Sequence, residues 1–159
     1  MKSLITYYSY SGNTNKVAQT IARVLNKNTE VDMQRLMPKE EIKTFLAQCR
    51  AAFRHKRIDL EGGVIFNVSP YDYILIGSPV WAFAPTPAIN TYLDNITGLA
   101  GKRVIFFLTS GSGAGVKRCF NIIKSALKEK GASRIDGINI QDKRLDDEEF
   151  IISTVEKLL

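Results

Sequence analysis

The sequence SLITYYSYSGNT, residues 3–14, holds a strand, a loop and the start of a helix in immediate succession. Its first half, Leu4 to Tyr8, is apolar, aromatic and β-branched, which predicts a buried strand. Its second half, Ser9 to Thr14, has small polar side chains and no charge, and a helical pattern begins directly after it. The stretch therefore has the form of a strand–loop–helix unit.

The loop carries groups that can hold a phosphate. Free amides at a helix N-terminus point outward, and the helix dipole favours an anion there. The hydroxyls of Ser9, Ser11 and Thr14 and the amide of Asn13 can surround phosphate oxygens, while Gly12 allows a tight turn. The alternative is an ordinary N-cap, since Ser, Thr and Asn also cap helices that bind nothing.

Strand and helix patterns alternate along the rest of the chain. Buried or edge strands are predicted at Glu30–Leu36, Tyr73–Gly77, Lys102–Leu108 and Arg134–Ile140. Helices are predicted after the first loop, from Pro38 onward, and at Thr86–Asn95, Val116–Gly131 and Asp146–Leu159. An irregular connection with a short strand at Val64–Asn67 is expected between Ile58 and Pro70. This alternation predicts one α/β domain, residues 1–159, with helices on both faces of a parallel sheet.

The charge is unevenly distributed along the chain. The formal net charge is +6, and residues 43–57 contain five Lys or Arg and no acid, whereas acids dominate from Asp142 to the end. The helix predicted from Pro38 carries this basic cluster and has an apolar stripe expected to be buried. Such asymmetry suggests an electrostatic partner, although a solvated helix face explains it as well.

Several classes of protein are disfavoured by composition. Cys49 and Cys119 lie far apart and His55 is the single histidine, so no metal site is expected. No apolar run has the length of a membrane span, and a strand begins directly after Met1, so we expect neither membrane association nor a signal peptide. We expect a cytoplasmic protein.

Three uncharged loops should meet at one edge of the sheet. In a parallel sheet, ligands bind beyond the carboxyl ends of the strands, and these loops follow Tyr8, Gly77 and Leu108. The absence of acids disfavours a receiver domain, and neither the P-loop nor the dinucleotide-binding spacing is present. A phosphate loop, an aromatic surface at Trp81 and a glycine-rich third loop suit flavin mononucleotide (FMN).

At these loops the chain resembles the flavodoxin family. Ser9-Tyr10-Ser11-Gly12-Asn13-Thr14 is similar to the flavodoxin phosphate loop, [ST]-x-[ST]-G-N-T. The second loop, Gly77-Ser-Pro-Val-Trp81, resembles the second flavin loop of flavodoxin-like oxidoreductases, and residues 109–113 resemble the third more loosely. The resemblance covers nearly the whole chain and implies a flavodoxin-like three-layer sandwich, sheet order 2-1-3-4-5, with non-covalent FMN.

The resemblance also implies which residues bind the cofactor. It places the phosphate on the side chains of Ser9, Ser11, Asn13 and Thr14 and on the amides of Tyr10 and Gly12. It places the flavin ring and ribityl chain on Ser78, Pro79, Val80 and Trp81, followed by Ala82. It places the pyrimidine end on Thr109, Ser110, Gly111 and Gly113, in a loop that includes Ser112.

Three departures separate this chain from typical flavodoxins. The chain is basic, whereas those electron carriers are typically acidic. Ala82 stands where the family often has a glycine, and a residue other than glycine resists positive φ. The three loops also lack the acids that the family commonly carries near the ring. We therefore expect a bound, reduced flavin anion to be destabilised less than in an acidic flavodoxin.

Three functions follow from the resemblance. In the first two the flavin carries the chemistry, so no catalytic side chain is expected. One is an electron shuttle for a partner protein such as an acidic, ferredoxin-like donor, docking on basic helices expected to share one sheet face. Another is an NAD(P)H-dependent reductase of quinones or other small acceptors. The third is a non-redox binding module, but nucleic acid is not the expected partner. The sequence leaves monomer and homodimer open.

Overall fold

The computed structural model describes all 159 residues, which form one five-stranded sheet in the order β2-β1-β3-β4-β5. Every neighbouring pair of strands is parallel. The strands are β1 (Lys2–Tyr7), β2 (Glu30–Arg35), β3 (Tyr73–Pro79), β4 (Arg103–Ser110) and β5 (Arg134–Gln141). The predicted order 2-1-3-4-5, with β2 at one edge, is confirmed.

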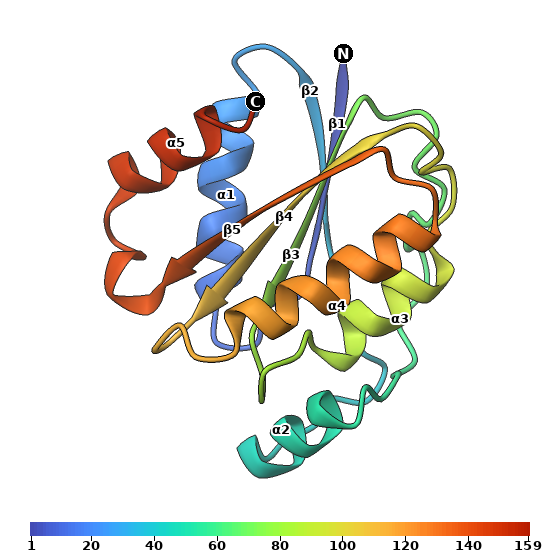
Figure 1. The fold of residues 1–159 in the computed structure, drawn as a ribbon, viewed down its shortest axis with the longest axis vertical. Helices are drawn as coiled ribbons and strands as arrows, with labels where there is room; N and C mark the ends of the chain where they lie inside the picture. The colour runs from blue at the N-terminus through green and yellow to red at the C-terminus, as the bar shows by residue number, and fades with distance from the viewer.

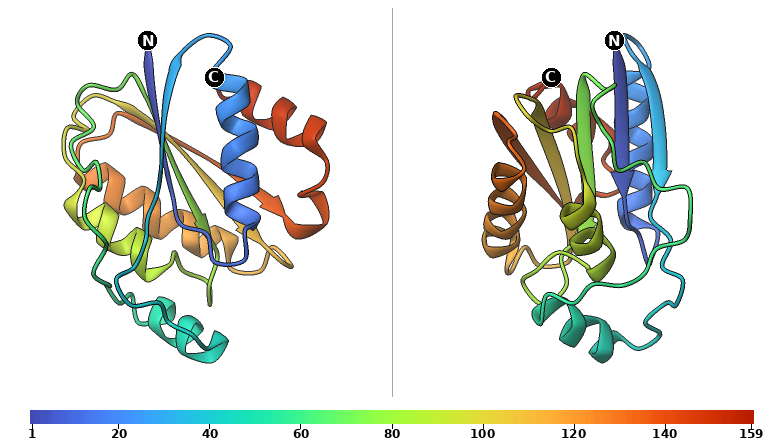
Figure 2. Two further views of the ribbon diagram at one scale, coloured as in Figure 1. Left: turned by 180° about the vertical axis from the view of Figure 1, so that it is seen from behind. Right: turned by 90° about the vertical axis from the view of Figure 1, so that its right-hand side faces the viewer.

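Helices cover both faces of the sheet, as predicted (Figures 1 and 2). They are α1 (Asn13–Leu25), α2 (Phe45–Phe53), α3 (Pro87–Asn95), α4 (Val116–Glu129) and α5 (Glu148–Glu156), with a short 3-10 turn, η1 (Asp142–Arg144). One core lies between the sheet and α3 with α4, and the other lies between the sheet and α1 with α5. These layers make the three-layer sandwich.

The central strand β3 shows why its sequence is apolar throughout. Ile74 and Ile76 belong to the core under α3 and α4, whereas Leu75 belongs to the core under α1 and α5. Successive side chains of a strand point to opposite faces, so a strand covered on both faces needs apolar residues at every position.

The segment between β2 and β3 differs from the prediction. A helix starting at Pro38 is wrong, because the backbone there pairs with residues 59–61 instead: the Lys39 amide donates to the Asp59 carbonyl (2.9 Å) and Pro38 bridges to Leu60. Helix α2 begins only after Thr44, whose side chain accepts from the Ala47 amide. The strand predicted at residues 64–67 is reduced to a single bridge between Asn67 and Thr97.

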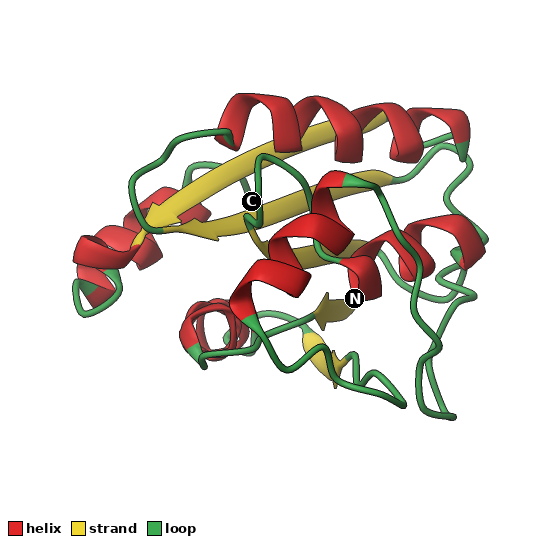
Figure 3. Ribbon diagram, turned by 90° about the horizontal axis from the view of Figure 1, so that it is seen from below, coloured by secondary structure: helices red, strands yellow, loops and turns green.

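Helix α2 also lies elsewhere than predicted. It does not share a sheet face with α4 but lies beyond the carboxyl ends of the strands, in front of the sheet in Figure 3. Its large apolar residues Phe45 and Phe53 are 75% and 54% exposed rather than buried. Its protein-facing side consists of Gln48, Ala51 and Ala52. The apolar stripe predicted from the sequence exists, but it faces away from the core.

Both chain ends lie at the opposite edge from α2 (Figure 1). None of the helices combines the length and the apolar character that a bilayer crossing requires.

Candidate functional site

The first loop presents free amide groups at the N-terminus of α1. Gly12 is the N-cap residue and has φ 97°, a left-handed conformation that favours glycine. The amides of residues 10–14 donate no hydrogen bond within the protein, whereas the next amide, of Asn15, donates to Ser9 Oγ (3.2 Å). Consecutive unpaired amides at a helix start form an anion-binding concavity.

Buried contacts fix the position of this loop. The hydroxyls of Thr14 and Thr109 are 2.8 Å apart and buried, which ties the first loop to the third. The guanidinium of Arg35 donates to the Ser9 carbonyl (2.6 Å). Ser9 and Thr14 therefore support the loop from beneath, while Ser11 and Asn13 line the open side.

The second loop contains a tight turn at Trp81. Trp81 and Ala84 exchange two backbone hydrogen bonds of 3.0 Å, and the two residues between them have positive φ, 46° for Ala82 and 67° for Phe83. Positive φ at both central positions is the pattern of a type I′ turn. Ala82 therefore adopts positive φ, contrary to expectation and although its residue type disfavours it, because closing this two-residue turn requires it.

Aromatic neighbours hold the Trp81 ring. It meets Tyr8 edge-on with centroids 5.6 Å apart and Tyr10 edge-on at 6.0 Å. The Tyr8 hydroxyl donates to the Glu41 carboxylate, and burial together with this carboxylate raises the pKa of Tyr8. The indole is half-buried and has one side on the cavity described below.

The third loop follows β4. Thr109 and Ser110 are buried at its start, and the Ser110 hydroxyl donates to the Asn139 side-chain oxygen at 2.9 Å. Gly111 and Ser112 are exposed, and Gly113 turns the chain with φ 80°. The amides of residues 111–113 donate no hydrogen bond within the protein and are free for a ligand.

The three loops meet at a cavity of about 640 Å³ at the carboxyl edge of the sheet. Such a volume is typical of a cofactor site. Ten predicted site residues line it: Tyr10, Ser11, Asn13, Pro79, Val80, Trp81, Thr109, Ser110, Gly111 and Ser112. The other six do not line it: Ser9, Gly12, Thr14, Ser78, Ala82 and Gly113. A second cavity, of about 530 Å³, lies between the ends of α1 and α5 and is lined by no residue of the three loops.

Asp142, which was not predicted as a site residue, brings a carboxylate to this cavity. It follows β5 directly and accepts a hydrogen bond from Asn13 Nδ2 (3.2 Å). It also lies beside the third loop, since a Cβ on Gly111 would be 3.7 Å from Asp142 Oδ2. The three loops are uncharged, as predicted, but the site as a whole is not. The position of Asp142 at the end of a parallel strand was the available signal.

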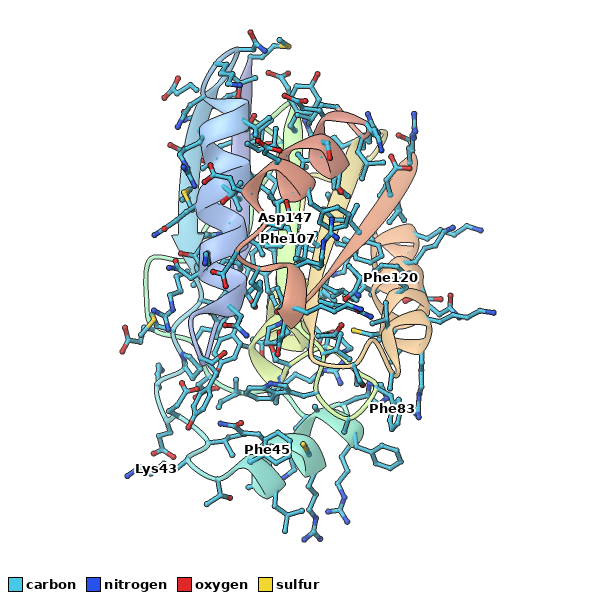
Figure 4. All side chains as sticks on the ribbon, turned by 90° about the vertical axis from the view of Figure 1, so that its left-hand side faces the viewer. Lys43, Phe45, Phe83, Phe107, Phe120 and Asp147 are labelled. Atoms are coloured by element: carbon cyan, nitrogen blue, oxygen red, sulfur yellow. The ribbon has the colours of Figure 1, made fainter.

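Helix α2 and the residues before it add a wall that was not predicted either. Lys43, Phe45 and Gln48 also line the cavity. Figure 4 shows Lys43, Phe45 and Phe83 toward the same, lower end of the molecule. Gln48 is 2% exposed, and its Nε2 donates to the Ile42 carbonyl (2.7 Å), which fixes the side chain. The helical spacing of these residues could not show which surface they cover.

The fold and the loops define a doubly wound α/β protein with a cavity and free amides at the switch point of its strand order. The family model described as Flavodoxin matches residues 2–149. The chain belongs to the flavodoxin family.

Several solved structures share this fold. A Bacteroides uniformis protein aligns with a TM-score of 0.77 at 22% identity, over 98% of this chain and 97% of its own. A Lactobacillus acidophilus flavoprotein in complex with FMN aligns with a TM-score of 0.68 at 25% identity, over 93% and 98%. Oxidised flavodoxin 2 from Bacillus cereus aligns with a TM-score of 0.65 at 25% identity, over 99% of each chain. No curated protein sequence matches this chain.

Proposed function

We propose that this chain binds FMN non-covalently and passes electrons between partners through it. The observation that carries the proposal is the meeting of three uncharged loops at one cavity, which is lined by residues with free amides and by Trp81. Family membership and the FMN complex of the Lactobacillus relative support the choice of cofactor.

Each part of the cavity suits one part of FMN. The amides of residues 10–14, with Ser11 and Asn13, would hold the phosphate, and the dipole of the 13-residue helix α1 favours its charge. The indole of Trp81 would cover the ring, and the free amides of residues 111–113 would donate to its polar edge. When bound, FMN supplies chemistry in which one or two electrons are accepted and released.

The protein groups around the ring position it and exclude water. Phe45 and Val80 add apolar surface to the cavity, and the buried Thr14–Thr109 contact keeps the first and third loops at a fixed separation. A cofactor held by prearranged groups needs little ordering when it binds.

A second candidate function is an NAD(P)H-dependent reductase of a small acceptor. The exposed rings of Phe45 and Phe83 near the cavity favour it, since a nicotinamide or a quinone can stack on such surfaces. A one-electron carrier needs no such second ring site. The rate of reduction by each donor separates the two functions.

Anaerobic stopped-flow mixing of the FMN-loaded protein tests the proposal. We expect a one-electron reductant to bleach the flavin absorbance within seconds, and NADH or NADPH to leave it unchanged over minutes. Fast bleaching by either nucleotide would establish the reductase instead. Failure of the protein to bind FMN at all would leave only a non-redox binding module.

A further inference from the structure

Helix α2 presents an apolar face to solvent. Phe45, Leu46 and Phe53 are 75%, 79% and 54% exposed, and the partly exposed Cys49 lies on the same helical face between them. The side of α2 that faces the protein has small or polar residues instead. Large apolar side chains that gather on one exposed face mark an interaction site more often than scattered ones do.

Unpaired positive charges accompany this face. Six bases from α2, its flanks and the first turn of α4 take part in no ion pair: Lys43, Arg50, Arg54, Lys56, Lys117 and Arg118. The Arg118 guanidinium lies 5.4 Å from the centroid of the Phe53 ring, which joins the charged and apolar groups into one surface. We call this surface, Lys43 to Lys56 with Lys117 and Arg118, the α2 surface.

The acids nearby do not neutralise the α2 surface. The Glu41 carboxylate accepts from the Tyr8 hydroxyl, and Asp94 is paired with Arg57 through bonds of 2.6 and 3.0 Å. Three acids near the C-terminus are paired elsewhere, Asp146 with Lys16, Asp147 with Arg144 and Glu148 with Arg23. Asp142 lines the same cavity as Lys43 and is in no ion pair, but it is one carboxylate beside six unpaired bases, so the α2 surface keeps an excess of positive charge at the carboxyl edge.

The α2 surface adjoins the cavity, since Lys43 and Phe45 belong to both. We propose that it is the docking site of an acidic electron-transfer protein, whose contact face has an apolar centre and a rim of carboxylates. This inference rests on the proposed function, because it places the electron donor at the mouth of the flavin site. Aromatic and arginine side chains are the residues that most often dominate such interfaces.

Two other occupants fit the α2 surface less well. A symmetric dimer would bring the same six bases of two copies together, and like charges facing each other oppose association. An anionic membrane matches the charge and the apolar stripe, but a lipid surface supplies no electrons to the cavity. Charge complementarity and position together favour an acidic redox protein.

Stopped-flow reduction by an acidic [2Fe–2S] ferredoxin, used as the probe, tests the docking site. We expect the second-order rate constant of the FMN-loaded protein to fall about tenfold or more between roughly 50 and 500 mM NaCl. The variant Arg50→Glu/Arg54→Glu should lose about tenfold at low salt, and Leu46→Ser/Phe53→Ser should lose several-fold. The matched control, Lys124→Glu/Lys128→Glu, changes the net charge equally on the exposed side of α4 and should stay within about twofold.

Chemical reduction by dithionite separates the two levels of the hypothesis. If dithionite reduces every variant equally while ferredoxin discriminates among them, both the flavin function and the docking site stand. If dithionite works but ferredoxin does not react, or reacts equally with all variants, the docking proposal is overturned while the flavin function survives. Sedimentation of the protein with phosphatidylserine vesicles, or salt-sensitive self-association at micromolar concentration without ferredoxin binding, would assign the surface to a membrane or to a second copy.

Discussion

Replacing Gly115 by alanine tests how the turn that carries Trp81 is held in place. Gly115 is the N-cap residue of α4 and has φ 78°. A Cβ at this position would lie 2.2 Å from Phe83 Cδ1 and 2.7 Å from Phe83 Cα. Because the nearest obstacles include backbone, the turn itself must move to admit even one methyl group.

Two effects add up in this variant. Left-handed φ costs an alanine roughly 1–2 kcal/mol relative to glycine. Forced displacement of packed atoms typically costs roughly 1–3 kcal/mol more. Gly101 provides the matched control, since it has φ 73° but no atom lies within 4 Å of the place that a methyl group would take. Gly101→Ala should therefore lose about 1–2 kcal/mol, and Gly115→Ala roughly 2–5 kcal/mol.

Urea unfolding of the two variants measures this difference, and FMN titration measures its effect on the site. We expect Gly115→Ala to weaken FMN binding, because the turn positions Trp81, and Gly101→Ala to leave binding unchanged. Adding Phe83→Gly to Gly115→Ala should restore part of the stability, since it removes the clashing side chain. Equal losses in the two alanine variants, with equal FMN affinity, would refute the idea that contact between Gly115 and Phe83 fixes the turn.

Three further predictions concern charge and thiol chemistry. Asp142→Asn should tighten FMN binding about two- to fivefold at low salt, because a carboxylate beside an anionic ligand in near-aqueous dielectric costs roughly 0.5–1 kcal/mol. Weaker binding would instead make Asp142 a direct ligand. Burial raises the pKa of Cys119 to about 12, so a thiol reagent at about pH 8 should modify only Cys49 in the native protein and both cysteines after unfolding. Rapid modification of both cysteines in the native protein would contradict the burial of Cys119. The hydrogen bond from Arg57 lowers the pKa of Asp94 below its ordinary 3.8, so this exposed pair adds at most about 1 kcal/mol of stability above pH 3.8, and that stability is lost as the pH falls through the folded pKa. Asp94→Asn should therefore be less stable than the parent in urea at about pH 7 but equally stable near about pH 2. An equal deficit at both pH values would show that the charge of Asp94 is irrelevant.

The strands and the three loops could be predicted from the sequence, because a strand buried on both faces and a loop rich in small polar residues each have a distinct local composition. The apolar run 73–77 became the central strand β3, and the hydroxyl-rich run 9–14 became the loop with free amides. The alternation with helices predicted a parallel sheet covered on both faces, whereas the order of its strands was implied by the family resemblance alone. Local sequence patterns were sufficient to predict an element wherever the local preference of the residues agrees with the place of that element in the fold.

The position of helix α2 could not be predicted from the sequence, because helical periodicity identifies an apolar face without identifying what covers it. The spacing of Phe45, Cys49 and Phe53 is the same for a helix with its apolar face in the core and for one with that face exposed for binding another protein. The start of the helix was misplaced because Pro38 and Lys39 pair with a distant segment, and such long-range pairing has no local signature.

Asp142 and the conformation of Ala82 were missed for two different reasons. Asp142 follows the last strand, and sites form beyond strand ends, but its place in the sequence does not show that its side chain reaches Asn13 and the third loop. Ala82 has a conformation that its residue type disfavours, since the hydrogen bonds between Trp81 and Ala84 close a turn that needs positive φ. Tertiary geometry decided both positions.

The affinity of the flavin-free protein for FMN relative to riboflavin tests the central claim most directly. The two ligands share the ring and the ribityl chain and differ in the phosphate, which is the group assigned to the amides of residues 10–14. Two charge-assisted hydrogen bonds of about 1.5 kcal/mol each predict that fluorescence quenching will show FMN binding roughly 100-fold more tightly than riboflavin. Equal affinities for the two ligands, or no binding of either, would contradict the account.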